Sequence, residues 1–473
     1  MLHIAFVVSE PDSIEPFGVM SLVPHLTAAG HTCRLFCAEA TDLIPALTSF
    51  APQLVCYSST SGAHTYLAEV NRALKESLSF ISVFGGPHPT FFPDFIHEEG
   101  VDVIARGECD HSFALFCQGV VDHGHPVETP NFSIKTTRGI SSSPVAPLIQ
   151  DLDSLPFPDR ESYYSLSPKI RGYTVRSFLA SRGCPFSCSY CFNHSMDALY
   201  DGCFRRPRVR SPGSLIAEIR EVIGRYPTEF LAFRESIFPL NTAWLITFAR
   251  LMREHVRLPF YCHLRLDMVT PKRVALLREA GCHSVNVGIE AGSESIRRDL
   301  LGRDMSDETI IEGCRLLREA GIHILANNML GLPSTTFAQD LATLRLNQRA
   351  KPHYSLAMLW QPYPGTRLAR FAREEGWFTD SCDALEFSYY DHSHVTFKNP
   401  SDKRRVENLQ RLFAVAAKFP RLTPLVALLT RLPPNPVFDS IFKTVYLVYH
   451  QSEIFPHRMT PRDLRDHLRG LLE

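Results

Sequence analysis

The chain has 473 residues, more than a single hydrophobic core ordinarily organises and enough for two or three domains. Apolar residues make up 45% and charged residues 21% of the sequence, a composition that excludes an intrinsically disordered chain. Lys and Arg number 49 against 50 Asp and Glu, so no basic excess indicates a nucleic-acid partner.

The 13 cysteines, the amino terminus and the apolar runs together suggest where the protein works. The start, Met1-Leu2-His3-Ile4, leads directly into a strand-like run, so we expect no cleavable signal peptide. No apolar run reaches the roughly 18 residues of a membrane-spanning helix. We therefore interpret the cysteines as reduced thiols and metal ligands of a cytoplasmic protein, not as a disulfide framework.

Strand-like and helix-like segments alternate in the first part of the chain. Such alternation predicts an α/β domain with a doubly wound, Rossmann-like parallel sheet over residues 1–125. Ligands of these sheets bind at the carboxyl ends of the strands. The predicted strands are His3–Val8, Thr32–Phe36, Leu54–Ser58, Ile81–Val83 and Val101–Ile104, and the predicted helices include Met20–Ala29 and Thr65–Ser77.

A second alternating series follows residues 126–171, which are rich in Pro, Ser and Asp and are interpreted as a linker. Over residues 172–385 this series predicts a partial (β/α)6 barrel, whose site should lie at the carboxyl ends of its strands. Residues 386–473 break the rhythm and predict a small, mainly helical region. The predicted barrel strands are Ser177–Ala180, Phe230–Phe233, Phe260–Arg265, Ser284–Ile289, His323–Leu330 and Tyr354–Leu359.

Three cysteines lie within one short segment, directly after the first predicted barrel strand. Cys184, Cys188 and Cys191 are separated by three and then two residues, so their thiolates can converge on one small site. Four close thiols would indicate tetrahedral zinc, whereas three thiolates on a 4Fe-4S cluster leave one iron open for a small molecule. The plainer alternatives are a chance trio of buried cysteines and an incomplete zinc knuckle.

This spacing, with Tyr190 directly before the last cysteine, resembles the cysteine motif of the radical S-adenosylmethionine (SAM) superfamily. The resemblance implies that the three cysteines hold a 4Fe-4S cluster whose open iron binds SAM. It also implies reductive cleavage of SAM to a 5'-deoxyadenosyl radical, with electrons from a flavodoxin- or ferredoxin-type reductant. The similarity extends from about Ser177 to Ala369.

Several residues at the ends of later predicted strands resemble the SAM-binding positions of this family. Glu235 would meet the amino group, although Ser236 stands where the family usually has a second acidic residue. Glu290 would meet the ribose hydroxyls. The plainer interpretations are surface charges, charges at helix N-termini and simple turns. The implied SAM-binding residues are Tyr190, Glu235, Ser236, Arg265, Glu290 and Asn328.

The first domain resembles the cobalamin-binding domain often found ahead of a radical SAM barrel. Small residues at its strand ends would let the nucleotide tail of cobalamin run beside the backbone. The Asp-x-His-x-x-Gly motif that supplies an axial ligand is absent, so His88 is interpreted as a hydrogen-bonding or structural residue. A generic nucleotide- or protein-binding module is the alternative. The implied cobalamin contacts are Phe17, Gly18, Ser58, Ser59, Gly85, Gly86, Pro87, His88, Arg106, Gly107 and Glu108.

Together, the two resemblances imply a methyltransferase that acts on an unactivated carbon of a small molecule, through methylcobalamin and a 5'-deoxyadenosyl radical. Cyclisation, ring contraction or another rearrangement without methyl transfer stays open within the same family. A methylthiotransferase would usually carry three further cluster cysteines, for which the first domain offers no convincing loop. Outside catalysis, the alternatives are a cobalamin carrier or sensor and a zinc-containing scaffold.

The carboxyl-terminal region contains aromatic and aliphatic runs at Phe387–Tyr390, Leu422–Leu432 and Val445–His450. In the family this region closes over the barrel mouth, so the resemblance implies a substrate-capping role. The apolar runs are compatible with a pocket for a hydrophobic substrate, although such runs more often form a core. A small helical core is the alternative interpretation.

Overall fold

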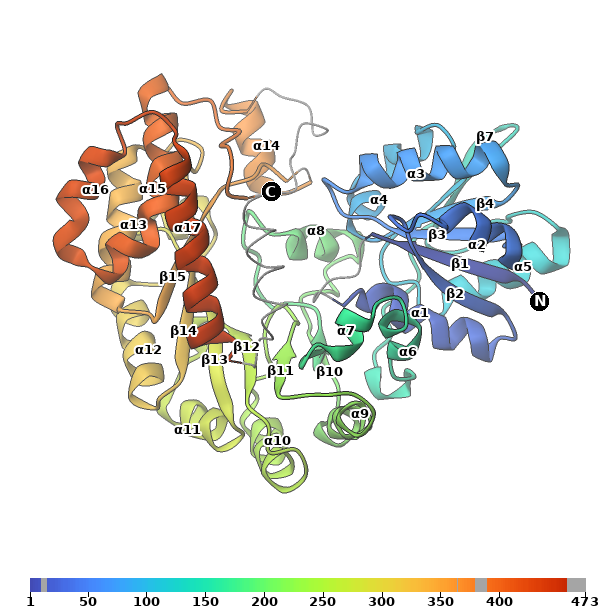
Figure 1. The fold of residues 1–473 in the computed structure, drawn as a ribbon, viewed down its shortest axis with the longest axis horizontal. Helices are drawn as coiled ribbons and strands as arrows, with labels where there is room; N and C mark the ends of the chain where they lie inside the picture. Colours follow the sequence, from blue (N-terminus) through green and yellow to red (C-terminus); the bar gives the residue numbers. More distant parts are fainter. Residues whose placement is uncertain (10–14, 364, 379–388, 457–473) are drawn as a thin grey trace. The chain divides into compact units, whose positions relative to one another are not determined.

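The computed structural model describes residues 1–9, 15–363, 365–378 and 389–456, which form two compact units (Figure 1). The first unit contains residues 1–173 and 192–205, and the second contains residues 174–191 and the other described residues from 206 onward. The boundary predicted between residues 385 and 386 lies outside the described residues.

The first unit is built on a seven-stranded sheet with the order β2-β1-β3-β4-β5-β6-β7. Its first five strands in sequence are parallel and confirm the predicted doubly wound fold. These strands are β1 (His3–Val8), β2 (Thr32–Cys37), β3 (Leu54–Ser58), β4 (Ile81–Gly85) and β5 (Val103–Ala105). The helices of the unit are α1 (Phe17–Ala28), α2 (Leu43–Phe50), α3 (His64–Ser77), α4 (Pro87–Phe91), α5 (Ser112–His123), α6 (Arg160–Tyr164), α7 (Pro168–Gly172) and α8 (Phe192–Leu199).

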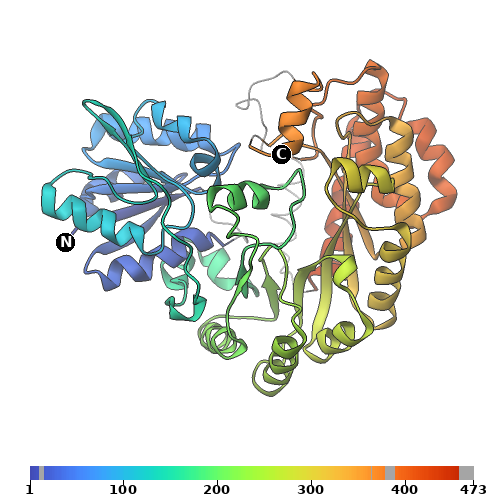
Figure 2. The same ribbon diagram turned by 180° about the vertical axis from the view of Figure 1, so that it is seen from behind.

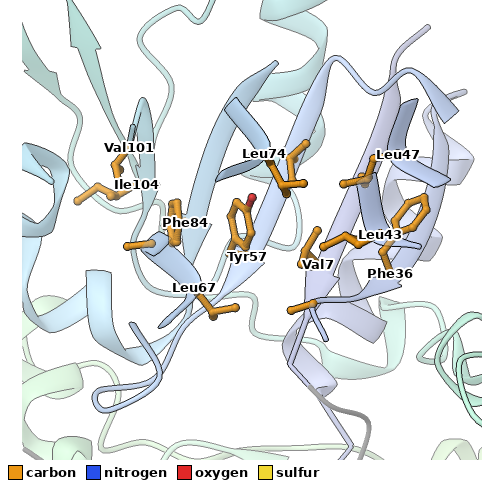
Figure 3. Close-up of a cluster of buried hydrophobic side chains, with 14 of the residues drawn as sticks. Val7, Phe36, Leu43, Leu47, Tyr57, Leu67, Leu74, Phe84, Val101 and Ile104 are labelled. Atoms are coloured by element: carbon orange, nitrogen blue, oxygen red, sulfur yellow. The ribbon is translucent and has the colours of Figure 1, made fainter. Parts of the chain in front are cut away.

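One face of this sheet packs against α2 and α3 through a continuous apolar core (Figure 3). Leu67 and Leu74 lie two turns apart on α3, so one helical face meets the sheet. Tyr57 and Phe84, from the neighbouring strands β3 and β4, stack with their ring centroids 4.4 Å apart. This packing fixes the carboxyl ends of β3 and β4, where several predicted ligand residues lie.

Residues 126–171, predicted as a linker, belong to the first compact unit instead. They begin with the hairpin of β6 (Phe132–Thr136) and β7 (Gly139–Ser142), which continues the sheet antiparallel to β5. Further along, Arg160 forms a buried ion pair with Glu15 at 2.9 Å. The Pro and Asp residues of this segment lie before and after the hairpin, mostly in the irregular stretch that follows β7.

The second unit contains a six-stranded, all-parallel sheet in the order β15-β14-β13-β12-β11-β8, which confirms the predicted parallel α/β series. Each strand of this sheet pairs with the sheet's next strand in chain order. The connecting helices cover the outer face of the sheet (Figures 1 and 2). The strands are β8 (Val175–Phe178), β11 (Phe230–Phe233), β12 (Phe260–Leu264), β13 (Cys282–Glu290), β14 (His323–Leu330) and β15 (Tyr354–Leu359). The connecting helices are α9 (Pro212–Arg225), α10 (Thr242–His255), α11 (Pro271–Glu279), α12 (Asp307–Glu319) and α13 (Phe337–Ala350).

The described carboxyl-terminal residues are helical, as predicted. Apolar side chains of α15 pack against β15 and α13, so this helix extends the core of the second unit. No helix in the described ranges is both long and apolar enough to cross a bilayer. The helices after β15 are α14 (Arg367–Glu374), α15 (Pro400–Lys418), α16 (Thr423–Leu429) and α17 (Pro436–Tyr449).

Candidate active site

The three cysteines lie on a loop of the second compact unit, which we call the barrel unit, and other segments of that unit hold the loop in place. The short strand β9 (Ser181–Arg182) pairs with β10 (Arg208–Val209), and Gly183, at φ +98°, turns the chain into the loop. The Ser189 amide donates to Leu301 at 3.0 Å, and the Ser189 carbonyl accepts from Leu368 at 2.9 Å. These bonds tie the middle of the loop to two segments more than a hundred residues further along the chain.

Two of the three thiols are buried and two guanidinium groups lie beside one of them. Cys184 and Cys188 are 7% and 8% exposed, whereas Cys191 is half-buried. Arg265 and Arg303 place a guanidinium nitrogen 3.8 and 3.7 Å from the Cys188 sulfur. Burial raises the pKa of Cys184, while the two guanidinium charges act in the opposite direction. The two guanidinium groups therefore place positive charge beside the loop, which offsets part of the cost of burying a thiolate there.

Arg265 is itself fixed by two neighbours. Its guanidinium donates two hydrogen bonds to Asp267, at 3.1 and 2.7 Å, and lies 3.7 Å from the centroid of the Phe186 ring. Because Phe186 belongs to the cysteine loop, this cation–π contact joins the end of β12 to that loop.

Among the described residues, no three His, Cys, Asp or Glu side chains converge closely enough to hold one metal ion. A cubane cluster makes a different demand, because its three thiolates bind three different irons and lie further apart than the ligands of one ion. The loop offers three thiols, partial burial and nearby positive charge. The residues present fit a 4Fe-4S cluster rather than a single zinc ion.

Tyr190, Glu290 and Arg303 form a hydrogen-bonded group beside this loop. Tyr190 donates to the Glu290 carboxylate at 3.0 Å, and Arg303 donates to the Tyr190 oxygen at 3.3 Å. A second Arg303 nitrogen donates to the Gly288 carbonyl at 2.7 Å. Burial raises the pKa of Glu290, and the charge of Arg303 opposes that rise. This group therefore couples the cysteine loop to the carboxyl end of β13.

The backbone around Glu290 is shaped to admit its carboxylate. Glu290 has a left-handed φ of +68°, which ends β13 in a sharp turn. A Cβ added to Gly288 would lie 2.1 Å from the Glu290 carboxylate, so no other residue fits there without displacing it. The Gly-Ile-Glu sequence thus places a buried carboxylate at a strand end.

Glu235 follows β11 and carries a buried carboxylate with one unused oxygen. Its Oε2 accepts a hydrogen bond from the Ala180 amide at 3.1 Å, whereas its Oε1 has no partner in the described structure. Burial raises the pKa of Glu235 to about 8. A buried carboxylate with an open oxygen can accept a cationic group. The neighbouring Ser236 is exposed.

Asn328 is fully buried, and its side chain is hydrogen-bonded within the protein. Its amide donates to Ala326 and Leu356 at 3.1 Å, and its side chain exchanges hydrogen bonds with Asn347 of α13 at 3.2 and 2.6 Å. Asn328 therefore joins β14 to the outer helix layer. Asn327 points to the opposite face of the strand, and its buried Oδ1 has no described partner.

Two polar residues of this region were missed by the sequence analysis as individual ligands. Gln361 lies two residues after the end of β15 and is 4% exposed, yet neither polar atom of its side-chain amide has a partner in the described structure. Arg303 lies in a turn between β13 and α12 rather than at a strand end. Buried polar groups without protein partners are the ones that a bound cofactor can satisfy.

In the first unit, the predicted residues Ser58, Ser59, Gly85 and Gly86 lie at the carboxyl ends of β3 and β4. Gly86 has φ +95°, and a Cβ there would lie 2.8 Å from the Ser59 carbonyl, so glycine is required. The Ser59 hydroxyl is fully buried and has no partner in the described structure. Ser58 is exposed at the same edge. A close backbone approach and an unused hydroxyl fit a bound polar chain such as a nucleotide tail.

His88 is held within the protein. Its ring stacks on His64 at 3.8 Å and on Phe92 at 4.8 Å, and its Nδ1 lies 3.2 Å from the Ser61 hydroxyl. Burial lowers the pKa of His88 to about 3, so the imidazole stays neutral at pH 7. This placement agrees with the structural interpretation of His88.

The loop after β5 is fixed by an aromatic residue from a distant part of the first unit. The Glu108 amide donates to the Tyr200 oxygen at 2.6 Å, and the Gly107 amide donates to Thr90 at 3.1 Å. The side chain of Arg106 donates to the Thr90 carbonyl at 3.2 Å. The predicted residues Phe17 and Gly18 begin α1, where a Cβ on Gly18 would meet open space.

Family models match both units of this chain. The model of the B12 binding domain matches residues 5–116, and the model of the radical SAM superfamily matches residues 178–346. The chain belongs to the radical SAM enzymes that carry a B12-binding domain. This family uses a 4Fe-4S cluster, SAM and cobalamin, for which the two units offer the residues described above.

Several curated proteins are similar to the chain. It is 27% identical over 342 residues to the uncharacterized methyltransferase PH0819 of Pyrococcus horikoshii, covering 70% of the chain and 72% of the relative. It is 24% identical to the anaerobic magnesium-protoporphyrin IX monomethyl ester cyclase of Rubrivivax gelatinosus, covering 85% of the chain and 73% of the relative. It is 25% identical to the hopanoid C-3 methylase of Methylococcus capsulatus, covering 81% of the chain and 72% of the relative.

Solved structures of cobalamin-binding radical SAM enzymes share the fold. OxsB with aqua-cobalamin and SAM matches with a TM-score of 0.71 at 16% identity, over 99% of this chain and 75% of that one. TsrM from Kitasatospora setae, with cobalamin and a 4Fe-4S cluster, matches with a TM-score of 0.64 at 17% identity. The match covers 95% of this chain and 100% of TsrM. These likenesses confirm the predicted order of the two α/β domains.

Proposed function

We propose that this protein is a cobalamin-dependent radical SAM methyltransferase that acts on an unactivated carbon of a small molecule. The observation that carries the proposal is the buried cysteine loop with two guanidinium groups beside Cys188, in a chain that also has a B12-binding domain. Relatives named as methyltransferases support the methyl-transfer outcome. When bound, the cluster with SAM supplies a 5'-deoxyadenosyl radical and cobalamin carries the methyl group.

In this proposal Cys184, Cys188 and Cys191 hold the cluster. Arg265 and Arg303 offset part of the negative charge that three thiolates bring into a buried site. Hydrogen bonds from Arg265 to Asp267 and from Arg303 to the Gly288 carbonyl hold the two guanidinium groups in place. Their charges would therefore stay beside the cluster in each of its redox states.

The SAM-binding residues of the proposal each use an observed feature. Glu235 accepts the SAM ammonium group through its unused Oε1. Glu290, oriented by Tyr190 and Arg303, accepts hydrogen bonds from the ribose. Gln361 is a buried amide with two unused polar atoms, so we assign it to SAM or to the substrate.

Cobalamin would bind at the carboxyl ends of β3, β4 and β5 in the first unit. Gly86 allows the backbone to approach closely, and the Ser59 hydroxyl can satisfy a polar group of the nucleotide tail. His88 lies inside a stack of rings, so we assign no cobalt ligand to it. A flavodoxin- or ferredoxin-type protein would supply the electrons.

The test is an assay of two SAM-derived products. The protein is purified without oxygen, reconstituted with iron, sulfide and hydroxocobalamin, and incubated with SAM and dithionite. We expect both 5'-deoxyadenosine and S-adenosylhomocysteine. The triple variant of Cys184, Cys188 and Cys191 to Ala should lose the deoxyadenosine, whereas Cys203→Ala, at an exposed thiol, should keep it.

The two products distinguish the proposal from its rival. Deoxyadenosine without S-adenosylhomocysteine, from protein that retains cobalamin, would support a rearrangement such as the cyclisation named for the Rubrivivax gelatinosus relative. Neither product from protein with full iron and sulfide content would contradict both.

A further inference from the structure

The segment from Lys418 to Val437, which we call the apolar ridge, exposes large apolar side chains to solvent. It runs from the end of α15 through α16 to the start of α17. Six of its side chains are between 38% and 61% exposed, which is unusual for residues of this type. These side chains are Phe419, Leu422, Leu425, Leu428, Leu432 and Val437.

The apolar ridge is a fixed surface rather than a poorly packed end. Val426 is buried toward α15, while Leu425 and Leu428 point outward from the same helix. Asn408 of α15 donates to the carbonyls of Thr430 and Leu432 at 3.1 and 2.8 Å, which fixes the turn after α16. In both views α16 lies at the outer edge of the barrel unit (Figures 1 and 2). The outward leucines therefore have a defined position.

The charged residues within the apolar ridge are all basic. Residues 408–438 contain four basic residues and no Asp or Glu. Arg411 pairs with Asp439, but Lys418, Arg421 and Arg431 are exposed. Arg421 and Arg431 have no ion-pair partner in the described part of the chain. Exposed cations next to an apolar row are complementary to an anionic lipid surface.

We propose that the apolar ridge docks on a lipid bilayer that contains anionic lipids. The leucines would enter the boundary between headgroups and acyl chains, and Lys418, Arg421 and Arg431 would meet lipid phosphates. A second copy of this chain is a poorer occupant, because a two-fold contact would bring these cations together without an acidic partner. Docking would place the barrel unit at the layer in which apolar substrates dissolve. This inference does not depend on the proposed methyl transfer.

Vesicle flotation of the full-length protein tests this proposal. The vesicles contain either phosphatidylcholine alone or equal parts of phosphatidylcholine and phosphatidylglycerol. We expect flotation with the anionic vesicles, weaker flotation with the neutral ones, and loss of binding at high salt. The double variant Leu425→Ser, Leu428→Ser should reduce the bound fraction by about tenfold or more. Arg421→Gln with Arg431→Gln should remove the preference for anionic vesicles.

The matched control is Leu115→Ser, because Leu115 is 61% exposed on α5 of the first unit and should not affect flotation. Unchanged thermal melts would show that all variants remain folded. The proposal is overturned if the protein does not float with anionic vesicles, or if the leucine variant floats as well as the natural protein. It is also overturned if sedimentation shows a dimer that the leucine variant converts to a monomer without any vesicle binding.

Discussion

Tyr190 donates a hydrogen bond from its phenol to the Glu290 carboxylate at 3.0 Å, and this bond joins the cysteine loop to the end of β13. The two residues are a hundred positions apart in sequence, and Arg303 bonds to the same phenol oxygen. The proposed cluster site and the proposed ribose site therefore share one hydrogen-bonded group. A change in one residue of this group should affect SAM more than the cluster.

Tyr190→Phe should raise the dissociation constant for SAM by about tenfold, because the buried Glu290 carboxylate loses a donor. Iron and sulfide content should stay at the level of the unaltered protein, since no cluster thiol is changed. Equilibrium dialysis with SAM and a metal assay measure the two quantities. Tyr66→Phe, at an exposed tyrosine, is the control. Loss of iron in the Tyr190 variant would contradict this separation of roles.

Glu235→Gln should stabilise the SAM-free protein at high pH. Because burial raises the folded-state pKa of Glu235 to about 8, the folded state holds a proton that the unfolded state releases above about 4.5. Stability contributed by this protonation is present below pH 4.5 and declines as the pH rises toward 8. At pH 8 the variant should be more stable by about 1–3 kcal/mol, measured by urea denaturation across this window.

The same Glu235→Gln variant should bind SAM at least about tenfold more weakly, because it cannot pair with the ammonium group as an anion. Stability and binding should thus change in opposite directions. A variant that lost both would indicate simple misfolding, and one that kept its SAM affinity would contradict the assignment of Glu235.

Gly288→Ala should displace Glu290, since the added Cβ would lie 2.1 Å from its carboxylate. We expect a loss of about 1–3 kcal/mol of stability and weaker SAM binding. Gly224→Ala on α9 is the matched control, because a Cβ there meets open space. That control should be neutral or slightly stabilising. If Gly288→Ala and Gly224→Ala changed stability and SAM binding equally, a clash with Glu290 would not be the cause.

Gly86→Ala should reduce the cobalamin content of reconstituted protein and leave its iron content unchanged. The added Cβ would lie 2.8 Å from the Ser59 carbonyl, and the positive φ of Gly86 is unfavourable for alanine. Visible absorbance and a metal assay separate the two cofactors. Gly172→Ala, where a Cβ meets nothing within 4 Å, should retain cobalamin. Normal cobalamin content in the Gly86 variant would argue against this site.

Much of the fold follows from short-range patterns in the sequence. The runs His323–Leu330 and Tyr354–Leu359 were predicted as strands, and β14 and β15 have the same bounds. The first barrel strand, β8, lies two residues earlier than predicted. The apolar run continues into the turn before β9, so hydrophobicity alone does not mark where hydrogen-bonded pairing stops.

The contacts at the candidate site depend on strand register and on distant partners, which local sequence patterns do not show. Asn327 and Asn328 are adjacent, and a shift of one residue decides which side chain faces the helix layer. Arg303 reaches Cys188 across 115 positions from a turn, and no local pattern indicates such a contact. The composition of residues 126–171 likewise does not show the antiparallel pairing of β6 with β5.

The path of the chain limits how its parts can be exchanged between relatives. Residues 192–205 directly follow Cys191 but belong to the first unit, where Tyr200 and Phe204 pack against Leu148. A chimera joined near residue 173 would therefore pair a foreign first unit with the original residues 192–205. An exchange that keeps both units intact must transfer residues 192–205 together with residues 1–173. A single crossover between two relatives cannot do this.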